Sequence, residues 1–125
     1  MVISKERIDE LRCKAAALLE SRPNAWCQGT FRQSNDDGTF AFCAYGALRE
    51  VAGYYDLNSL SNEQVKNYTD EDWDAFERRR TDLINDVNCA GAAEPFVAVT
   101  FNDTPNRTVE EVIARLRSGR DCKAE

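Results

Sequence analysis

The chain has 125 residues, of which 42% are hydrophobic and 30% charged, a composition typical of one folded domain rather than of a disordered chain. Its formal net charge of −6 argues against nonspecific binding to nucleic acid, which depends on Lys and Arg neutralising phosphates. The sequence contains no histidine, so Ser-His and Cys-His catalytic pairs, imidazole metal ligands and an imidazole general base are excluded within this chain.

The first predicted element is an amphipathic helix that begins after Ser4 and ends near Glu20. Its apolar residues recur at spacings of three and four, which indicates one buried stripe, and Ser4 is a good N-cap. Pro23 prevents the helix from continuing. Cys13 lies off the main apolar stripe, so the pattern assigns it no role.

Residues 26–42 have the pattern of a β-hairpin. Residues 26–32 and 39–42 are rich in aromatic and β-branched side chains, and the Asp37-Gly38 pair between them favours a turn that needs positive φ. The second strand leads directly into a helix that begins near Cys43 and ends at Gly53. Gly46 in this helix leaves room for another stretch of backbone to approach closely.

Residues 54–68 are polar and predict a loop with one short helical turn, because Ser61 and Gln64 have capping-box spacing. Thr69 is followed by three acidic residues, which favours the start of a helix that continues to about Asn88. Residues 90–95 are expected to be a connector.

Residues 96–101 are apolar at nearly every position and predict a central strand that is covered on both faces. Thr108 and Glu111 then form a capping box for a last helix that ends at Gly119, and the tail 120–125 is expected to fray. We therefore predict a single α+β domain over residues 1–125, with a small antiparallel sheet of about three strands packed with about four helices.

The five cysteines are widely spaced and include no C-x-x-C pair. They predict neither a disulfide framework nor a zinc site, and they favour a reducing compartment. The N-terminal residues have no apolar run of signal-peptide length, and no window has the length and hydropathy of a membrane span. We therefore expect a cytoplasmic protein.

One candidate catalytic set combines Cys43 at a helix start with Gln28 upstream and with Asn102 or Asp103 downstream. A helix N-terminus favours a thiolate, and the order of residue types is similar to that of papain-like enzymes. The histidine that those enzymes place between Cys and Asn is missing here, so the set lacks its general base. The competing interpretation of Cys43 is a buried, inert thiol.

A candidate ligand-binding site lies in the loop that follows residues 96–101. Asn102, Asp103, Arg107 and the free amide of Thr108 gather before a helix N-terminus, where an anion such as a phosphate could bind. In the competing interpretation, Asn102 and Asp103 hydrogen-bond only to their own turn. Aromatic side chains such as Trp26 could stack on a ligand or could fill the core.

Three groups of residues resemble a family of small uncharacterised bacterial and phage proteins. They are Trp26 with Gln28-Gly29, the run 43–48, and Asn102-Asp103 with residues 107–112. The resemblance implies a common fold and a pocket where the Cys helix meets the Asn-Asp loop. It implies no established activity.

These observations lead to three functional hypotheses. The first is a nonenzymatic cytosolic binding protein, encoded by a phage or mobile element, that sequesters a small anionic ligand or blocks a host protein. The second is an enzyme, a hydrolase or transferase, that depends on Cys43. The third is a structural or oligomeric component, for which an exposed Trp73 or Tyr55 would be the sign. No cofactor, metal or membrane is expected. For metals, the reason is that the acidic residues near Asp70 lack the spacing of a calcium loop.

Overall fold

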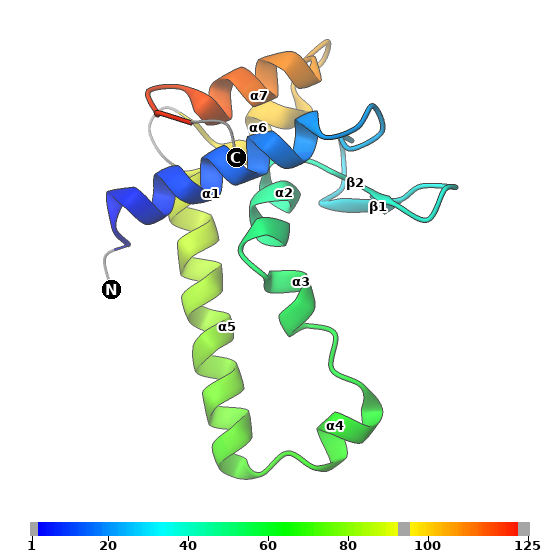
Figure 1. Cartoon of the computed structure of the whole chain (residues 1–125), viewed down its shortest axis with the longest axis vertical. Coiled ribbons are helices and arrows are strands. Elements are labelled where there is room, and N and C mark those ends of the chain that lie inside the picture. Colours follow the sequence, from blue (N-terminus) through cyan, green and yellow to red (C-terminus); the bar gives the residue numbers. More distant parts are fainter. Residues whose placement is uncertain (1–2, 93–95, 123–125) are drawn as a thin grey trace.

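Four helices form the body of the protein in the computed structural model, which describes residues 3–92 and 96–122 (Figure 1). Helix α1 (Lys5–Glu20) packs against α2 (Ala44–Val51), α5 (Asp70–Gly91) and α7 (Val109–Arg117). The Ser4 side chain accepts a hydrogen bond from the Arg7 amide, as expected of an N-cap. Apolar side chains from all four helices form the buried core, among them Leu11, Leu19, Leu48, Val87, Val112 and Leu116.

The sheet is a two-stranded antiparallel hairpin in the described part of the chain. Strand β1 (Arg32–Ser34) pairs with β2 (Phe40–Phe42), with Gln33 opposite Ala41. Strand β2 leads directly into α2, as the sequence predicts, and Gly53 after this helix has a φ of 87°. The α+β fold class is confirmed, with two strands instead of about three.

The predicted central strand at 96–101 is wrong, because this segment forms α6 (Ala98–Asp103). Ala98 and Asn102 lie four residues apart and are both buried, which is the spacing of one helix face. A short apolar run fits a buried helical turn as well as a buried strand, so its periodicity alone cannot distinguish them. Of the expected connector at 90–95, residues 90 and 91 belong to α5, and residues 93–95 lie outside the described residues.

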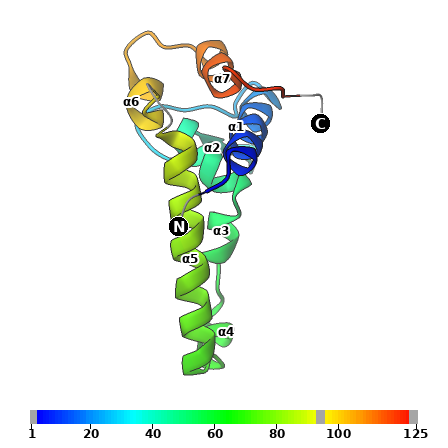
Figure 2. The same cartoon turned by 90° about the vertical axis from the view of Figure 1, so that its left-hand side faces the viewer.

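Residues 57–82 form a projection from the body that we call the arm (Figures 1 and 2). It contains the end of α3 (Tyr54–Leu57), then α4 (Asn62–Lys66) and the first half of α5. The predicted helical turn after Ser61 and its capping box with Gln64 are confirmed, whereas α3 was not predicted. No residue of α4 is buried, and the first buried residue of α5 is Leu83.

The C-terminal helix α7 begins at the predicted capping box of Thr108 and Glu111. After it, Cys122 forms a disulfide with Cys13, although the two are 109 positions apart. The expectation of no disulfide and of no role for Cys13 is therefore wrong. Sequence spacing could not reveal this bond, because the packing of α7 on α1 brings the two cysteines together.

The expected frayed tail begins at residue 120, and its described part contacts α1. Arg120 Nε lies 3.0 Å from Asp9 Oδ1, and Cys122 is bonded to Cys13. Residues 123–125 lie outside the described residues. No helix in the described ranges is both long enough and apolar enough to cross a membrane.

Candidate functional site

Cys43 is the N-cap of α2, at the junction with β2. Its Sγ accepts a hydrogen bond of 3.3 Å from the amide of Gly46, and the residue is only 2% exposed. Burial raises the pKa of the Cys43 thiol above its ordinary value, although the Gly46 amide acts in the opposite direction. A protonated thiol in the core is a poor nucleophile at neutral pH.

Asn102 is completely buried, and all of its carboxamide is hydrogen-bonded. Its Oδ1 accepts from the indole Nε1 of Trp26 at 2.6 Å and from the amide of Ala44 at 2.9 Å. Its Nδ2 donates to the carbonyl of Cys27 and to Oδ1 of Asp103, both at 3.0 Å. One side chain thus joins residues 26–27, the start of α2 and the end of α6.

Gln28 and Asp103 extend these contacts. Gln28 Nε2 donates to the carbonyl oxygens of Asn102 at 2.8 Å and of Thr104 at 3.3 Å. Asp103 Oδ1 accepts from the amide of Gly29 at 3.1 Å. The structure therefore brings the predicted residues of the Cys helix and the Asn-Asp loop together as a closed set of hydrogen bonds. We call this set the Asn102 clasp, made of residues 26–29, 44 and 102–104.

Arg107 and Thr108 lie beside the clasp, and both donate hydrogen bonds within the chain. Arg107 Nε donates to the carbonyl of Phe101 at 3.0 Å, and its guanidinium carbon lies 3.8 Å from the centroid of the Phe101 ring. The Thr108 amide donates to Glu111 Oε1 at 2.9 Å, and this bond is the main reason why the pKa of Glu111 is lowered. The carboxylate of Glu111 thus occupies the helix N-terminus where an anion was expected.

A second site was not predicted, and Arg49 is at its centre. The side chain extends from α2 over aromatic rings from three segments. The centroids of Tyr54 and Phe31 lie 3.9 and 5.0 Å from its guanidinium carbon. Those of Tyr55 and Tyr45 lie 5.4 and 5.9 Å away. A cavity of about 220 Å³, here called the Arg49 pocket, is lined by Phe31, Tyr45, Arg49, Tyr54, Ile84 and Val87.

The Arg49 pocket has a positive edge. No carboxylate in the described ranges forms a salt bridge with Arg49 or with Arg80. Hydrogen bonds with Asn58 and with Arg80 hold the pKa of Tyr54 below its ordinary value, so a second guanidinium lies beside this residue of the pocket lining. The sequence signal was the spacing of Tyr45 and Arg49, which puts an aromatic ring and a cation on one face of a helix.

No group of three or more acidic or cysteine side chains in the described ranges is arranged to hold a metal ion. Neither a curated protein nor a solved structure matches the chain. A sequence profile matches residues 4–121, which is nearly the whole chain, and it describes a family whose function is unknown. Membership of an uncharacterised family was predicted from the residues at 26–29, 43–48 and 102–112, and it is confirmed. The chain belongs to the family of unknown function DUF6197.

Proposed function

We propose that this protein is a nonenzymatic binding protein that holds a small anionic ligand in the Arg49 pocket. The observation that carries the proposal is the guanidinium of Arg49, which lies among four aromatic rings and forms no salt bridge in the described part of the chain. Guanidinium groups bind carboxylates and phosphates through paired hydrogen bonds, and they keep their charge at all ordinary pH values.

The size and lining of the pocket narrow the class of ligand. Its volume of about 220 Å³ is below the range of about 300–1,000 Å³ that is usual for drug-sized ligands. Phe31, Ile84 and Val87 provide apolar walls, and Arg49 provides the charged group. A single aromatic ring that carries a carboxylate or a phosphate fits this combination.

The loop at 101–108 is a weaker candidate for the same role. The amide oxygen and nitrogen of Asn102 are fully used in the clasp, and Arg107 donates to Phe101 and Glu111. A ligand there would have to displace Glu111 from the Thr108 amide. The Arg49 pocket requires no such exchange.

A titration with phenyl phosphate, monitored through the amide chemical shifts in NMR spectra, tests the proposal. We expect saturable shifts at residues around Arg49, and affinity at least about tenfold lower for Arg49→Gln. Arg49→Lys keeps the charge but loses the paired geometry, so it should bind with intermediate affinity. Circular dichroism would verify that each variant is folded.

Arg107→Gln is the matched control, because it removes the same charge from the predicted loop. It should bind phenyl phosphate like the wild type. If Arg107→Gln abolished binding while Arg49→Gln retained it, the ligand site would be the loop. If the wild-type protein bound neither phenyl phosphate nor benzoate, the Arg49 pocket would not be a site for aromatic anions.

A cytoplasmic location and a phage or mobile-element origin are part of the same proposal. Three cysteines with free thiols, Cys27, Cys43 and Cys89, support a reducing compartment, whereas the Cys13–Cys122 disulfide is more typical of an oxidising one. Trapping thiols in intact cells before lysis, followed by mass spectrometry, would determine whether this pair is oxidised. Gene neighbourhood would test the origin.

A further inference from the structure

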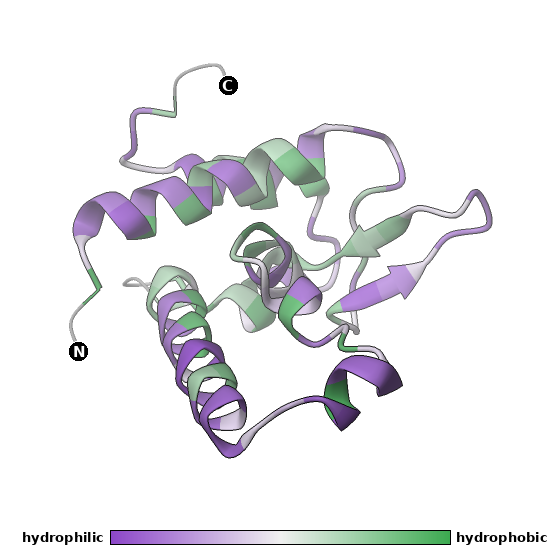
Figure 3. Cartoon of the chain, turned by 60° about the horizontal axis from the view of Figure 1, so that its bottom comes forward, coloured by the Kyte–Doolittle hydropathy of each residue, from purple (hydrophilic) through white to green (hydrophobic). Residues whose placement is uncertain are grey.

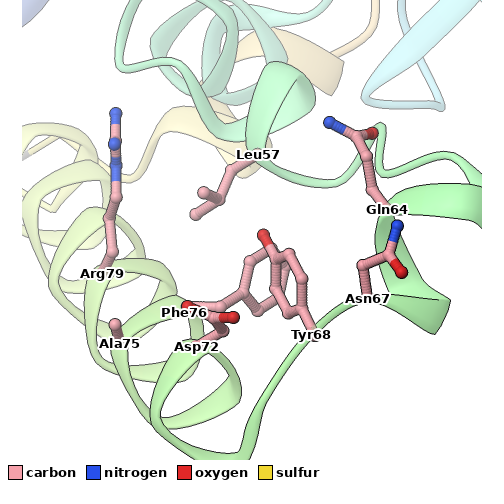
Figure 4. A pocket seen from close by; sticks show the side chains of 8 residues that line it. All are labelled: Leu57, Gln64, Asn67, Tyr68, Asp72, Ala75, Phe76 and Arg79. Atoms are coloured by element: carbon pink, nitrogen blue, oxygen red, sulfur yellow. The ribbon is translucent and has the colours of Figure 1, made fainter.

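The arm contains an open groove between α5 and the limb formed by α3 and α4 (Figure 4). Its volume is about 510 Å³. Helix α5 contributes Asp72, Ala75, Phe76 and Arg79, and the opposite limb contributes Leu57, Gln64, Asn67 and Tyr68.

Aromatic rings in this groove, and that of Trp73 beside it, are only partly covered. The rings of Tyr68, Trp73 and Phe76 contact one another with centroid separations of 4.9 to 6.3 Å, and Trp73 is 37% exposed. Further along the same face of α5, Leu83 and Val87 are buried against the body. The hydropathy colouring shows that hydrophilic residues otherwise dominate the arm (Figure 3). The apolar face of α5 thus continues into the arm, where Tyr68 of the opposite limb contacts Phe76 but leaves it half-buried.

We propose that a second copy of this chain occupies the groove, with α5 packed antiparallel on α5 about a two-fold axis. The four α5 residues of the groove are spaced at 0, 3, 4 and 7 positions, so they are symmetric about the midpoint between Ala75 and Phe76. An antiparallel two-fold pairing centred there places Asp72 of each copy opposite Arg79 of the other. It also places the small Ala75 opposite the large Phe76. The patch is therefore complementary to itself in charge and in shape, as a two-fold interface requires.

Charge favours a second copy over a basic segment of another protein. Residues 62–77 carry six carboxylates and one lysine, and Arg78, Arg79 and Arg80 follow directly. No residue of the arm forms a salt bridge in the described part of the chain. A basic segment would meet Arg79 inside the groove, whereas an antiparallel copy brings the acidic turn of each α5 beside the arginines of the other.

Sedimentation equilibrium over micromolar to millimolar concentrations tests the proposal. We expect a reversible monomer–dimer equilibrium for the wild-type protein. Asp72→Arg and Arg79→Asp each create two like-charge contacts across the axis, so each should weaken dimerisation on the order of 100-fold. The double variant Asp72→Arg with Arg79→Asp restores opposite charges and should recover most of the wild-type affinity.

Asp74→Arg is the matched control, because it makes the same charge change two residues along, on a different face of a helix with 3.6 residues per turn. It should dimerise like the wild type. All three residues are exposed, but Asp72 also accepts a hydrogen bond from the Thr69 amide in the capping box of α5, so circular dichroism must verify that each variant keeps its helices. A wild-type protein that stays monomeric, a double variant that is not rescued, or an equal loss in Asp74→Arg would overturn the proposed pairing.

Discussion

The indole of Trp26 donates a hydrogen bond of 2.6 Å to the side-chain oxygen of Asn102, a residue 76 positions later in the chain. The same oxygen accepts from the amide of Ala44 at the start of α2. Because Asn102 is fully buried, water cannot replace these bonds when the side chain is lost. The Asn102 clasp is therefore a structural junction, and a chemical role for these side chains would first require breaking it.

Asn102→Ala should destabilise the protein by about 3 kcal/mol, because it leaves several buried donors and acceptors without partners. Asn102→Asp should also destabilise it, since an oxygen would then face the carbonyl of Cys27 and the carboxylate of Asp103. Urea unfolding followed by circular dichroism measures both effects. Asn85→Ala, at an exposed position of α5, is the control and should change stability by less than about 0.5 kcal/mol.

Gly46→Ala should be among the most damaging substitutions in the chain. A Cβ at this position would lie 1.8 Å from the carbonyl oxygen of Phe31, which is backbone and cannot rotate away. The same carbonyl accepts from the amide of Cys43 at 3.3 Å, so the approach positions the start of α2. We expect a loss of about 3 kcal/mol or more in urea unfolding, or no folded protein.

Gly91→Ala provides the comparison for Gly46→Ala. Its added Cβ would lie 3.4 Å from that of Ala98, an ordinary contact at the end of a helix. Because alanine favours helix over glycine, stability should stay equal or rise by up to about 1 kcal/mol. If both variants lost the same free energy of unfolding, the close approach of the Phe31 backbone to α2 would not be the cause of the loss.

Thiol reactivity should follow burial rather than position at a helix start. Cys89 is exposed and should react first with iodoacetamide at neutral pH. Desolvation raises the pKa of Cys27 from 9.0 to about 11, so its thiolate fraction should be very small at neutral pH and its alkylation rate should keep rising with pH until about 11. Cys43, whose pKa is also raised, should react most slowly. Peptide mass spectrometry gives the three rates, and rapid alkylation of Cys43 at neutral pH would instead favour the enzyme hypothesis.

Reduction of the Cys13–Cys122 bond should lower the free energy of unfolding by about 4 kcal/mol. The reason is that the intact disulfide closes a loop of 109 residues and so limits the conformations of the unfolded chain. The measurement is urea unfolding with and without reductant. Cys122→Ser should have the stability of the reduced wild type and should not respond to reductant. A reductant effect of equal size in that variant would assign the stabilisation to another cause.

The contact between α1 and α7 should weaken in acid. Arg117 donates two hydrogen bonds to the carboxylate of Glu20, and these lower the pKa of Glu20 below its ordinary value of 4.5. A lowered folded pKa means that the stabilisation is present above pH 4.5 and is lost as the pH falls through the folded value. The coupling of Glu20→Gln with Arg117→Gln in a double-mutant cycle should therefore disappear at low pH. Coupling that persisted in acid would mean that charge is not its source.

The features that sequence predicted well depend on neighbouring residues. The capping boxes at Ser61 and Thr108 and the N-cap at Ser4 involve contacts three residues apart, and each one marks a real helix start. The direct connection of β2 to α2 at Cys43 was also predicted, because it too depends on residues that are neighbours in the sequence. The close approach permitted by Gly46 was also predicted, although its partner, the backbone of Phe31, was not.

The features that sequence missed depend on residues far apart in the chain. Residues 98–103 form a helix in place of the predicted strand, because the core and the Asn102 clasp give this turn its buried face, and an apolar run does not encode the choice between helix and strand. The Cys13–Cys122 bond and the Arg49 pocket likewise join segments that only the packed helices bring together. Asn102 was expected in the Cys43 set, at a ligand site or bonded to its own turn, but apart from Asp103 its side-chain and backbone partners are in residues 26–28 and 44.

The pairing of α1 with α7 makes the core depend on contacts between the two ends of the described chain. The buried face of α1, with Leu11 and Leu19, is completed by Val112 and Leu116 of α7. Helices α2 and α5 cover the rest of this face, so the contact with α7 joins the segments that are farthest apart in the sequence, and contacts of such long sequence separation form slowly. A chain cut before residue 109 would therefore lack the α7 side of this face, although α2 and α5 would still be present to cover the rest of it.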